Sequence, residues 1–191
     1  LSSTGDMGYL EFAGRNMPTE PEALIAPYFS MDERTVDKWL PVNLEMAKRT
    51  KEQNLSRRVL LEVVVDVGLL DSPKFDALLR GIAETPVDGV ALWVDGLDET
   101  QASSRVLSMY VRALATIGRT KPLTILYGSY LSVAMARLHP GWALRAVCYS
   151  LDYGESRSVT PVGGGIRSNR FYYPRMHARI RFEDAQELAQ P

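Results

Sequence analysis

The stretch Arg58–Val67, with the sequence RVLLEVVVDV, decides the fold class. It is almost continuously apolar and rich in β-branched residues, which is typical of a parallel strand covered on both faces. Ser72–Pro73 then supplies a capping residue and a first-turn proline for a helix that Thr85–Pro86 ends. The apolar residues of this helix repeat at the helical spacing i, i+3, i+4, i+7: Phe75, Leu78, Leu79 and Ile82. The stretch therefore predicts one strand–helix unit.

The same unit recurs along the chain. Val87–Val94 predicts a strand, and Asp98 or Thr100 can cap a long helix that runs to about Ile117. Further strands are predicted at 9–13, 123–127 and 143–149, further helices at 36–51 and 129–138, and a proline-containing loop at 14–31. Strands that alternate with helices indicate βαβ units and a parallel sheet.

An α/β fold of parallel βαβ units can close in two ways. The glycine fingerprint G-x-G-x-x-G of dinucleotide folds is absent, and the predicted strands end in polar residues, which favours a (β/α)8 TIM-type barrel. A complete barrel takes about 250 residues, so a chain of 191 predicts an incomplete or trimmed one. An open doubly wound sheet is the alternative. We expect a single domain over 1–191, with the βα units at 8–155 and a basic, aromatic segment at 156–182.

Composition excludes several classes of protein. Hydrophobic residues make up 46% of the chain and charged residues 24%, which excludes a disordered tail or a fibrous repeat. No run approaches the roughly 18 apolar residues of a membrane span, so we expect no membrane partner. The single cysteine, Cys148, excludes an internal disulfide framework and a zinc site of several thiolates, and its apolar strand predicts a core position. With no signal-peptide pattern at the start, we expect a cytoplasmic protein.

In either closure, ligands bind at the carboxyl ends of the strands. Asp66 and Asp95 end two predicted strands and are candidate acid–base groups, although each can instead cap a neighbouring loop amide. Trp93 is a candidate aromatic wall or a core residue. Tyr127–Gly128 leads into a helix start at Ser129, where the backbone can approach a ligand and the helix N-terminus can hold an anion. The other interpretation is that Ser129 only caps this helix.

The segment that follows the last predicted strand, 149–157, is dense in polar residues. Asp152 and Glu155 are candidate catalytic carboxylates, as an acid–base pair or as nucleophile and helper, and they could instead be ligands of a hard cation. Tyr153 is a candidate binding residue, and Arg157 can pair with a substrate anion or with Glu155. We predict that this segment forms the centre of the site. No metal-binding residues are assigned, and the two histidines of the chain exclude a histidine-rich metal site.

Charge is distributed unevenly. The window 156–182 holds six arginines, His177 and no acid, with three aromatic residues at 171–173. Guanidinium groups can bind phosphates while aromatic rings stack on bases, so this window is a candidate nucleic-acid contact. A solvated basic face is the other interpretation. Tyr173 and His177 are its candidate ligand contacts, and its candidate phosphate-binding residues are Arg167, Arg170, Arg175, Arg179 and Arg181.

The order of the last units resembles the barrel of the tRNA-guanine transglycosylase family. The residues that carry this resemblance are Asp88–Ala91 through Asp98–Glu99, and Lys121–Pro122 through Tyr127–Gly128. The resemblance implies a barrel that exchanges a base on a nucleic acid through a carboxylate nucleophile. In that family the carboxylate follows the strand that here ends near Cys148, whereas the nearest acid in this chain is Asp152, and the clustered zinc-binding cysteines are missing.

These patterns leave more than one class of function open. We expect an enzyme or enzyme-derived barrel that binds a phosphate- or nucleobase-containing ligand at the carboxyl ends of its strands. The alternative is a non-catalytic subunit whose arginine- and tyrosine-rich segment binds nucleic acid or a protein. A third interpretation is a barrel that serves only as a scaffold. No cofactor is predicted from the sequence.

Overall fold

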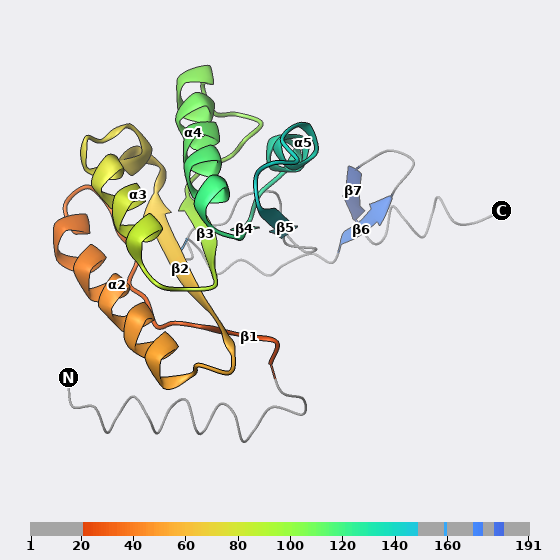
Figure 1. Cartoon of the computed structure of the whole chain (residues 1–191). Coiled ribbons are helices and arrows are strands. Elements are labelled where there is room, and N and C mark those ends of the chain that lie inside the picture. Colours follow the sequence, from red (N-terminus) through yellow and green to blue (C-terminus); the bar gives the residue numbers. More distant parts are fainter. Residues whose placement is uncertain (1–20, 149–158, 160–169, 174–177, 182–191) are drawn as a thin grey trace.

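The computed structural model describes residues 21–148, 159, 170–173 and 178–181. These form alternating strands and helices, which confirms the predicted α/β class (Figure 1). The strands are β1 (Ala23–Ile25), β2 (Arg58–Asp66), β3 (Gly89–Asp95), β4 (Leu123–Leu126), β5 (Leu144–Cys148), β6 (Arg170–Tyr173) and β7 (Ala178–Arg181). The helices are α2 (Val36–Gln53), the 3-10 turn η1 (Val67–Asp71), α3 (Lys74–Glu84), α4 (Ser104–Thr120) and α5 (Tyr130–Leu138).

Five strands form one parallel sheet in the order β1-β2-β3-β4-β5. Each strand pairs with the next strand along the chain, so the described sheet has no point where the order reverses. Doubly wound sheets have such a reversal, and the ligand binds there. The predicted parallel sheet is confirmed. The strands β6 and β7 form a separate antiparallel hairpin.

The helices pack along one side of the sheet (Figure 1). Right-handed crossovers between sequential parallel strands place successive helices on the same face. The core lies between this face and the helices. It includes the predicted α3 stripe, from Phe75 to Ile82, together with Tyr110, Leu114 and Ile117 of α4. The apolar spacing of these helices is therefore explained by their packing on the sheet.

The side chains of β2 point alternately to the two faces of the sheet. Val59, Leu61, Val63 and Val65 belong to the core beneath the helices. Successive side chains of a strand point to opposite faces, so Glu62 lies on the other face, yet it is only 6% exposed. Both faces of β2 are thus buried, as its apolar sequence predicts, and one of them contains a carboxyl group.

The prediction of a loop at 14–31 is wrong in part. β1 lies within it and pairs with β2, with Ala23 opposite Arg58. The chain then continues beside β2 as far as a parallel bridge between Met31 and Val65. A strand of three residues between prolines is too short to show a periodic pattern. The predicted strand at 9–13 lies outside the described residues.

Two local predictions are also corrected. Ser103, and not Asp98 or Thr100, caps α4, because its hydroxyl accepts a hydrogen bond from the Val106 amide. The Asp98 carboxylate instead accepts from the amide and hydroxyl of Thr100 and forms a turn before the helix. Cys148, expected in the core, is exposed, because β5 is the last strand of the described sheet and its burial is low.

An ion pair supports the amino edge of the sheet. The Asp88 carboxylate accepts from the Val59 amide at 2.7 Å and from Lys51 Nζ at 2.7 Å. Burial acts to raise the pKa of Asp88, but the hydrogen bonds from Lys51 and the Val59 amide bring it below its ordinary value. This pair joins the end of α2 to the start of β3, on the edge away from the predicted site.

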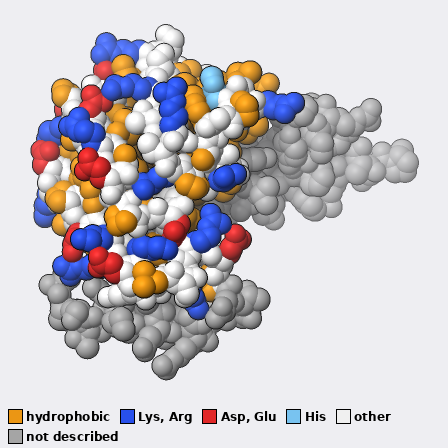
Figure 2. All heavy atoms as spheres, viewed as in Figure 1, with side chains coloured by type: hydrophobic (Ala, Val, Ile, Leu, Met, Phe, Trp, Pro, Cys, Tyr) orange, Lys and Arg blue, Asp and Glu red, His pale blue; other side chains and the backbone are white. Residues whose placement is uncertain are grey.

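The outer surface of the helices is polar. Figure 2, drawn from the same side as Figure 1, shows acidic and basic side chains interspersed there. Several form ion pairs between neighbouring helices, such as Lys74 with Asp37 and Arg112 with Asp76. None of the helices in the described part of the chain combines the length and apolar character that a bilayer crossing requires.

Candidate functional site at the carboxyl edge of the sheet

The two predicted aspartates lie side by side. Asp66 and Asp95 are register partners at the carboxyl ends of β2 and β3. The Asp66 carboxylate is exposed and accepts from the Gly68 amide at 2.8 Å, which matches its interpretation as a loop cap. Asp95 is half-buried and accepts from the Val159 amide at 2.9 Å. Both carboxylates thus hold backbone at the edge where a parallel sheet binds its ligands.

Two aromatic rings meet at the same edge. The Trp93 and Tyr127 rings lie with centroids 4.6 Å apart and planes tilted by 46°. Both side chains are half-buried. Tyr127 has a φ of 55°, in the left-handed region that costs a non-glycine residue about 1 kcal/mol or more. A strained aromatic residue at a strand end is typical of functional sites, because the surrounding structure must hold it there.

Glu62 lies behind this ring pair on the same face of the sheet. Its register partner is Ala91, two residues before Trp93 on β3. Its carboxyl group is hydrogen-bonded to the Tyr28 hydroxyl. Burial raises the pKa of Glu62, and the hydrogen bond from Tyr28 acts in the opposite direction. Burial and the nearby charge of Glu62 raise the pKa of Tyr28, and a smaller contribution comes from Tyr127.

We call Tyr28, Glu62, Trp93 and Tyr127 the aromatic–carboxyl cluster. Glu62 belongs to β2 and Trp93 to β3, Tyr127 directly follows β4, and Tyr28 lies in the segment after β1. Sequence reasoning missed Glu62 and Tyr28. The spacing of Glu62 and Asp66 was the available signal, since residues four apart in a strand share a face.

The segment after β1 is fixed by the side chain of Asn43. This residue of α2 is 1% exposed and makes two hydrogen bonds of 2.8 Å, accepting from the Phe29 amide and donating to the Phe29 carbonyl. The Phe29 ring stacks on Trp39 at 4.2 Å. With Phe29 held by α2, its neighbour Tyr28 is placed to reach Glu62.

A buried carboxylate occupies the N-terminus of α5. Glu99, 9% exposed, accepts from the Ser129 and Ser132 amides at 3.0 and 3.1 Å and from the Ser132 hydroxyl. The Tyr110 hydroxyl lies 2.8 Å from Ser132 Oγ. Ser129 also caps α5, as predicted, by accepting from the Tyr130 amide. A side chain of the chain itself, Glu99, therefore occupies this helix start, which agrees with the interpretation of Ser129 as a cap.

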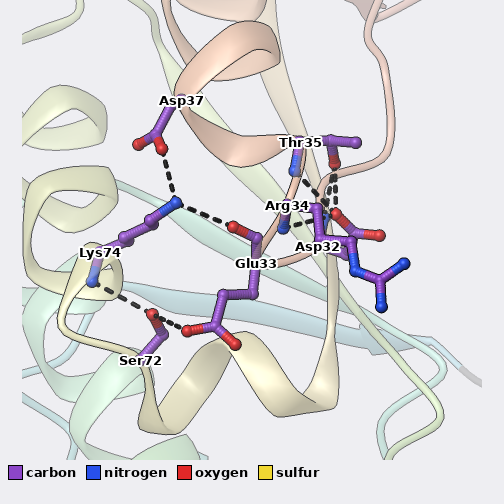
Figure 3. A network of polar contacts seen from close by, with 7 residues as sticks. All are labelled: Asp32, Glu33, Arg34, Thr35, Asp37, Ser72 and Lys74. Carbon is purple, nitrogen blue, oxygen red and sulfur yellow. Dashed lines mark hydrogen bonds and ion pairs between the residues drawn. The ribbon is translucent and has the colours of Figure 1, made fainter.

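A polar network joins two loops at the same edge, as Figure 3 shows. Lys74 Nζ donates to the Glu33 carbonyl at 2.9 Å and to Asp37 at 2.5 Å, and the Ser72 hydroxyl donates to the Glu33 carboxylate at 3.2 Å. These contacts tie the β1–α2 loop to the start of α3. Asp32 accepts from the hydroxyl and amide of Thr35, and the pKa of Asp32 is lowered as a result.

The structure brings together some of the predicted site residues. Asp66, Asp95, Trp93 and Tyr127–Gly128 all lie at the carboxyl edge of neighbouring strands. Tyr173 lies in the hairpin, at the end of β6. Among the described residues, no group of three His, Cys, Asp or Glu side chains is arranged to hold a metal ion. The predicted residues that lie outside the described part are Asp152, Tyr153, Glu155, Arg157, Arg167, Arg175 and His177.

Comparison with models of known protein families gives no match to this chain. A search of curated proteins gives no match either. The function is therefore argued from the site itself.

Proposed function

We propose that the chain is a (β/α)-barrel-type domain that binds a nucleobase-containing ligand at the carboxyl ends of its strands, with Glu62 as its acid–base group. The observation that carries this proposal is a buried carboxyl group, Glu62, on the same face of the sheet as the Trp93 ring, which packs on Tyr127. A nucleobase offers a flat face to aromatic rings and N–H donors to a carboxyl group.

The charges of the cluster favour a base over a phosphate. Asp66 and Asp95 end neighbouring strands at this edge, Glu62 lies behind them, and a phosphate would be repelled by each ionised carboxylate. The helix start that could have attracted a phosphate already binds Glu99. A ligand that donates hydrogen bonds fits these groups better.

A raised pKa suits Glu62 for proton exchange with a ligand. A carboxyl group that ionises closer to neutral pH can both donate and accept a proton under ordinary conditions. The Tyr28 hydroxyl orients this carboxyl group. The proposal does not include base exchange of the transglycosylase kind, because no acid follows Cys148 directly.

The barrel part of the proposal is supported by strand order. Sequential parallel strands with helices on one side are the arrangement from which barrels are built. Doubly wound sheets carry helices on both faces and reverse their order. Glu62 then belongs to the inner face, where barrel ligands reach the strand ends.

The test is calorimetric titration of the full chain with guanosine, adenosine, cytidine and uridine, and with ribose 5-phosphate. We expect at least one nucleoside to bind, and ribose 5-phosphate to bind more weakly than that nucleoside. Trp93→Leu should weaken binding about tenfold or more, as expected when a stacking ring is lost. Glu62→Gln should weaken binding and remove its pH dependence.

The matched control is Trp142→Leu. Trp142 is also half-buried and stacked, on His139 at 4.1 Å, but it precedes β5 at the amino edge. This variant should bind like the wild type, and circular dichroism should show that both variants are folded. Equal losses in the two tryptophan variants, or no binding of any nucleoside, would refute the proposal.

A further inference from the structure

The hairpin of β6 and β7 separates its residues into two faces. In an antiparallel pair, opposed residues share a face and successive residues alternate. The register places Arg170 opposite Arg181 and Tyr172 opposite Arg179. These four positions form one face. The other face carries the apolar and aromatic positions Phe171, Tyr173, Ala178 and Ile180.

The first face is a concentration of positive charge. Arg170 and Arg181 are directly opposed, and like charges at opposed positions destabilise a hairpin. Neither strand of the hairpin contains an acid, and the nearest acids in the sequence are Glu183 and Asp184, after Arg181. A polyanion bound to this face would offset the repulsion. The pairing therefore favours an anionic partner over a neutral one.

We propose that the β6–β7 hairpin binds a single-stranded nucleic acid through the face of Arg170, Tyr172, Arg179 and Arg181. The arginines supply three phosphate contacts in a row of cross-strand neighbours. Tyr172 stands among them and supplies a ring on which an unpaired base stacks. Duplex nucleic acid and lipid headgroups offer phosphates but no free base face. This function does not depend on the aromatic–carboxyl cluster.

The test is fluorescence anisotropy of the full chain with a labelled single-stranded RNA of about 20 nucleotides, over about 50 to 500 mM salt. The triple variant R170Q/R179Q/R181Q should lose about tenfold or more in affinity. Each phosphate contact on a single strand contributes about 0.7 to the salt slope, so the slope should fall by about 2. The control R80Q/R119Q/R137Q removes the same charge from exposed positions on α3, α4 and α5 and should leave both values unchanged.

A second pair of variants separates stacking from charge. Tyr172→Ala should weaken RNA binding about fivefold or more without changing the salt slope. Tyr173→Ala, on the other face, should have a smaller effect. Equal losses in the two arginine triples, or tighter binding to the matching duplex or to phosphatidylserine vesicles, would overturn the proposal.

Discussion

The exposed Tyr28 side chain is hydrogen-bonded through its hydroxyl to the buried Glu62 carboxyl group, on the face of the sheet opposite the described helices. Burial raises the pKa values of both groups. The hydrogen bond favours the ionised form of Glu62, and the charge of Glu62 adds to the rise in the pKa of Tyr28. The ionisation of Glu62 should therefore depend on pH and on substitutions at Tyr28.

The first prediction concerns stability and pH in Glu62→Gln. The pKa of Glu62 is raised in the folded state, so its protonated form contributes stability that is present below the ordinary value of 4.5 and lost as the pH rises through the folded-state pKa. The wild type should therefore lose stability relative to Glu62→Gln as the pH rises from 4.5 through the folded-state pKa of Glu62. Urea unfolding at several pH values measures this difference.

Glu45→Gln is the control for this titration. Glu45 is exposed, and its hydrogen bond from Arg49 lowers its pKa, so its effect has the opposite sign and stays small. If Glu62→Gln and Glu45→Gln follow the same curve, Glu62 does not titrate as a buried group.

The second prediction concerns Tyr28→Phe. Removing the hydroxyl removes the hydrogen bond that lowers the pKa of Glu62, so this pKa should rise further. The loss of one hydrogen bond should cost about 1 kcal/mol of unfolding free energy. Carboxyl-carbon NMR of labelled glutamate follows the Glu62 titration directly. A midpoint that stays in place or falls would show that Tyr28 does not act on Glu62.

The third prediction concerns Glu99. Glu99→Ala leaves the Ser129 and Ser132 amides and the Ser132 hydroxyl without their acceptor in a buried place. The variant should lose about 3 kcal/mol of unfolding free energy. For comparison, Ser103→Ala removes the cap of α4 and should cost only about 1 kcal/mol. Equal costs in denaturant unfolding would contradict the role of Glu99 as the buried anchor of α5.

The fourth prediction concerns the glycine that follows the ring pair. A Cβ at Gly128 would lie 2.7 Å from Ile125 Cγ2 and 2.8 Å from Val147 Cγ1. Gly128→Ala should therefore destabilise the fold by about 2 kcal/mol, because the closely packed strands cannot yield. Gly141→Ala is the matched control, since nothing lies within 4 Å of its Cβ position. Thermal melts that shift equally in both variants would contradict this packing.

The fifth prediction concerns the amino edge. Asp88 has a lowered pKa, so its ion pair with Lys51 contributes stability that is present above the ordinary value of 3.8 and lost as the pH falls through the folded-state pKa. Asp88→Asn should be less stable than the wild type at neutral pH, and this gap should close in acid. A gap that is the same at all pH values would show that the charge of Asp88 is unimportant.

The fold class could be predicted from the sequence because its signals are local. The β-branched stretch of β2 and the apolar spacing of α3 each lie within about ten consecutive residues. Their alternation led to the parallel sheet. β1 was missed because three residues between prolines show no period, and its pairing with β2 joins Ala23 to Arg58 across the whole of α2.

The site could be predicted only in part. The rule that strand ends carry the ligand selected Asp66, Asp95, Trp93 and Tyr127. Glu62 lies within a strand and not at its end, so the strand-end rule does not select it. The contacts of Glu99 join residues about thirty positions apart, and no local sequence spacing predicts a contact over that distance. Only the folded chain shows that this helix start is already occupied.

The central claim is that a base binds at the aromatic–carboxyl cluster, and the indole N–H signals of the three tryptophans test it most directly. In a two-dimensional ¹H–¹⁵N NMR titration with the tightest-binding nucleoside, the Trp93 signal should shift and saturate, while those of Trp39 and Trp142 stay in place. A Trp93 signal that does not move while the nucleoside saturates the protein would contradict the account.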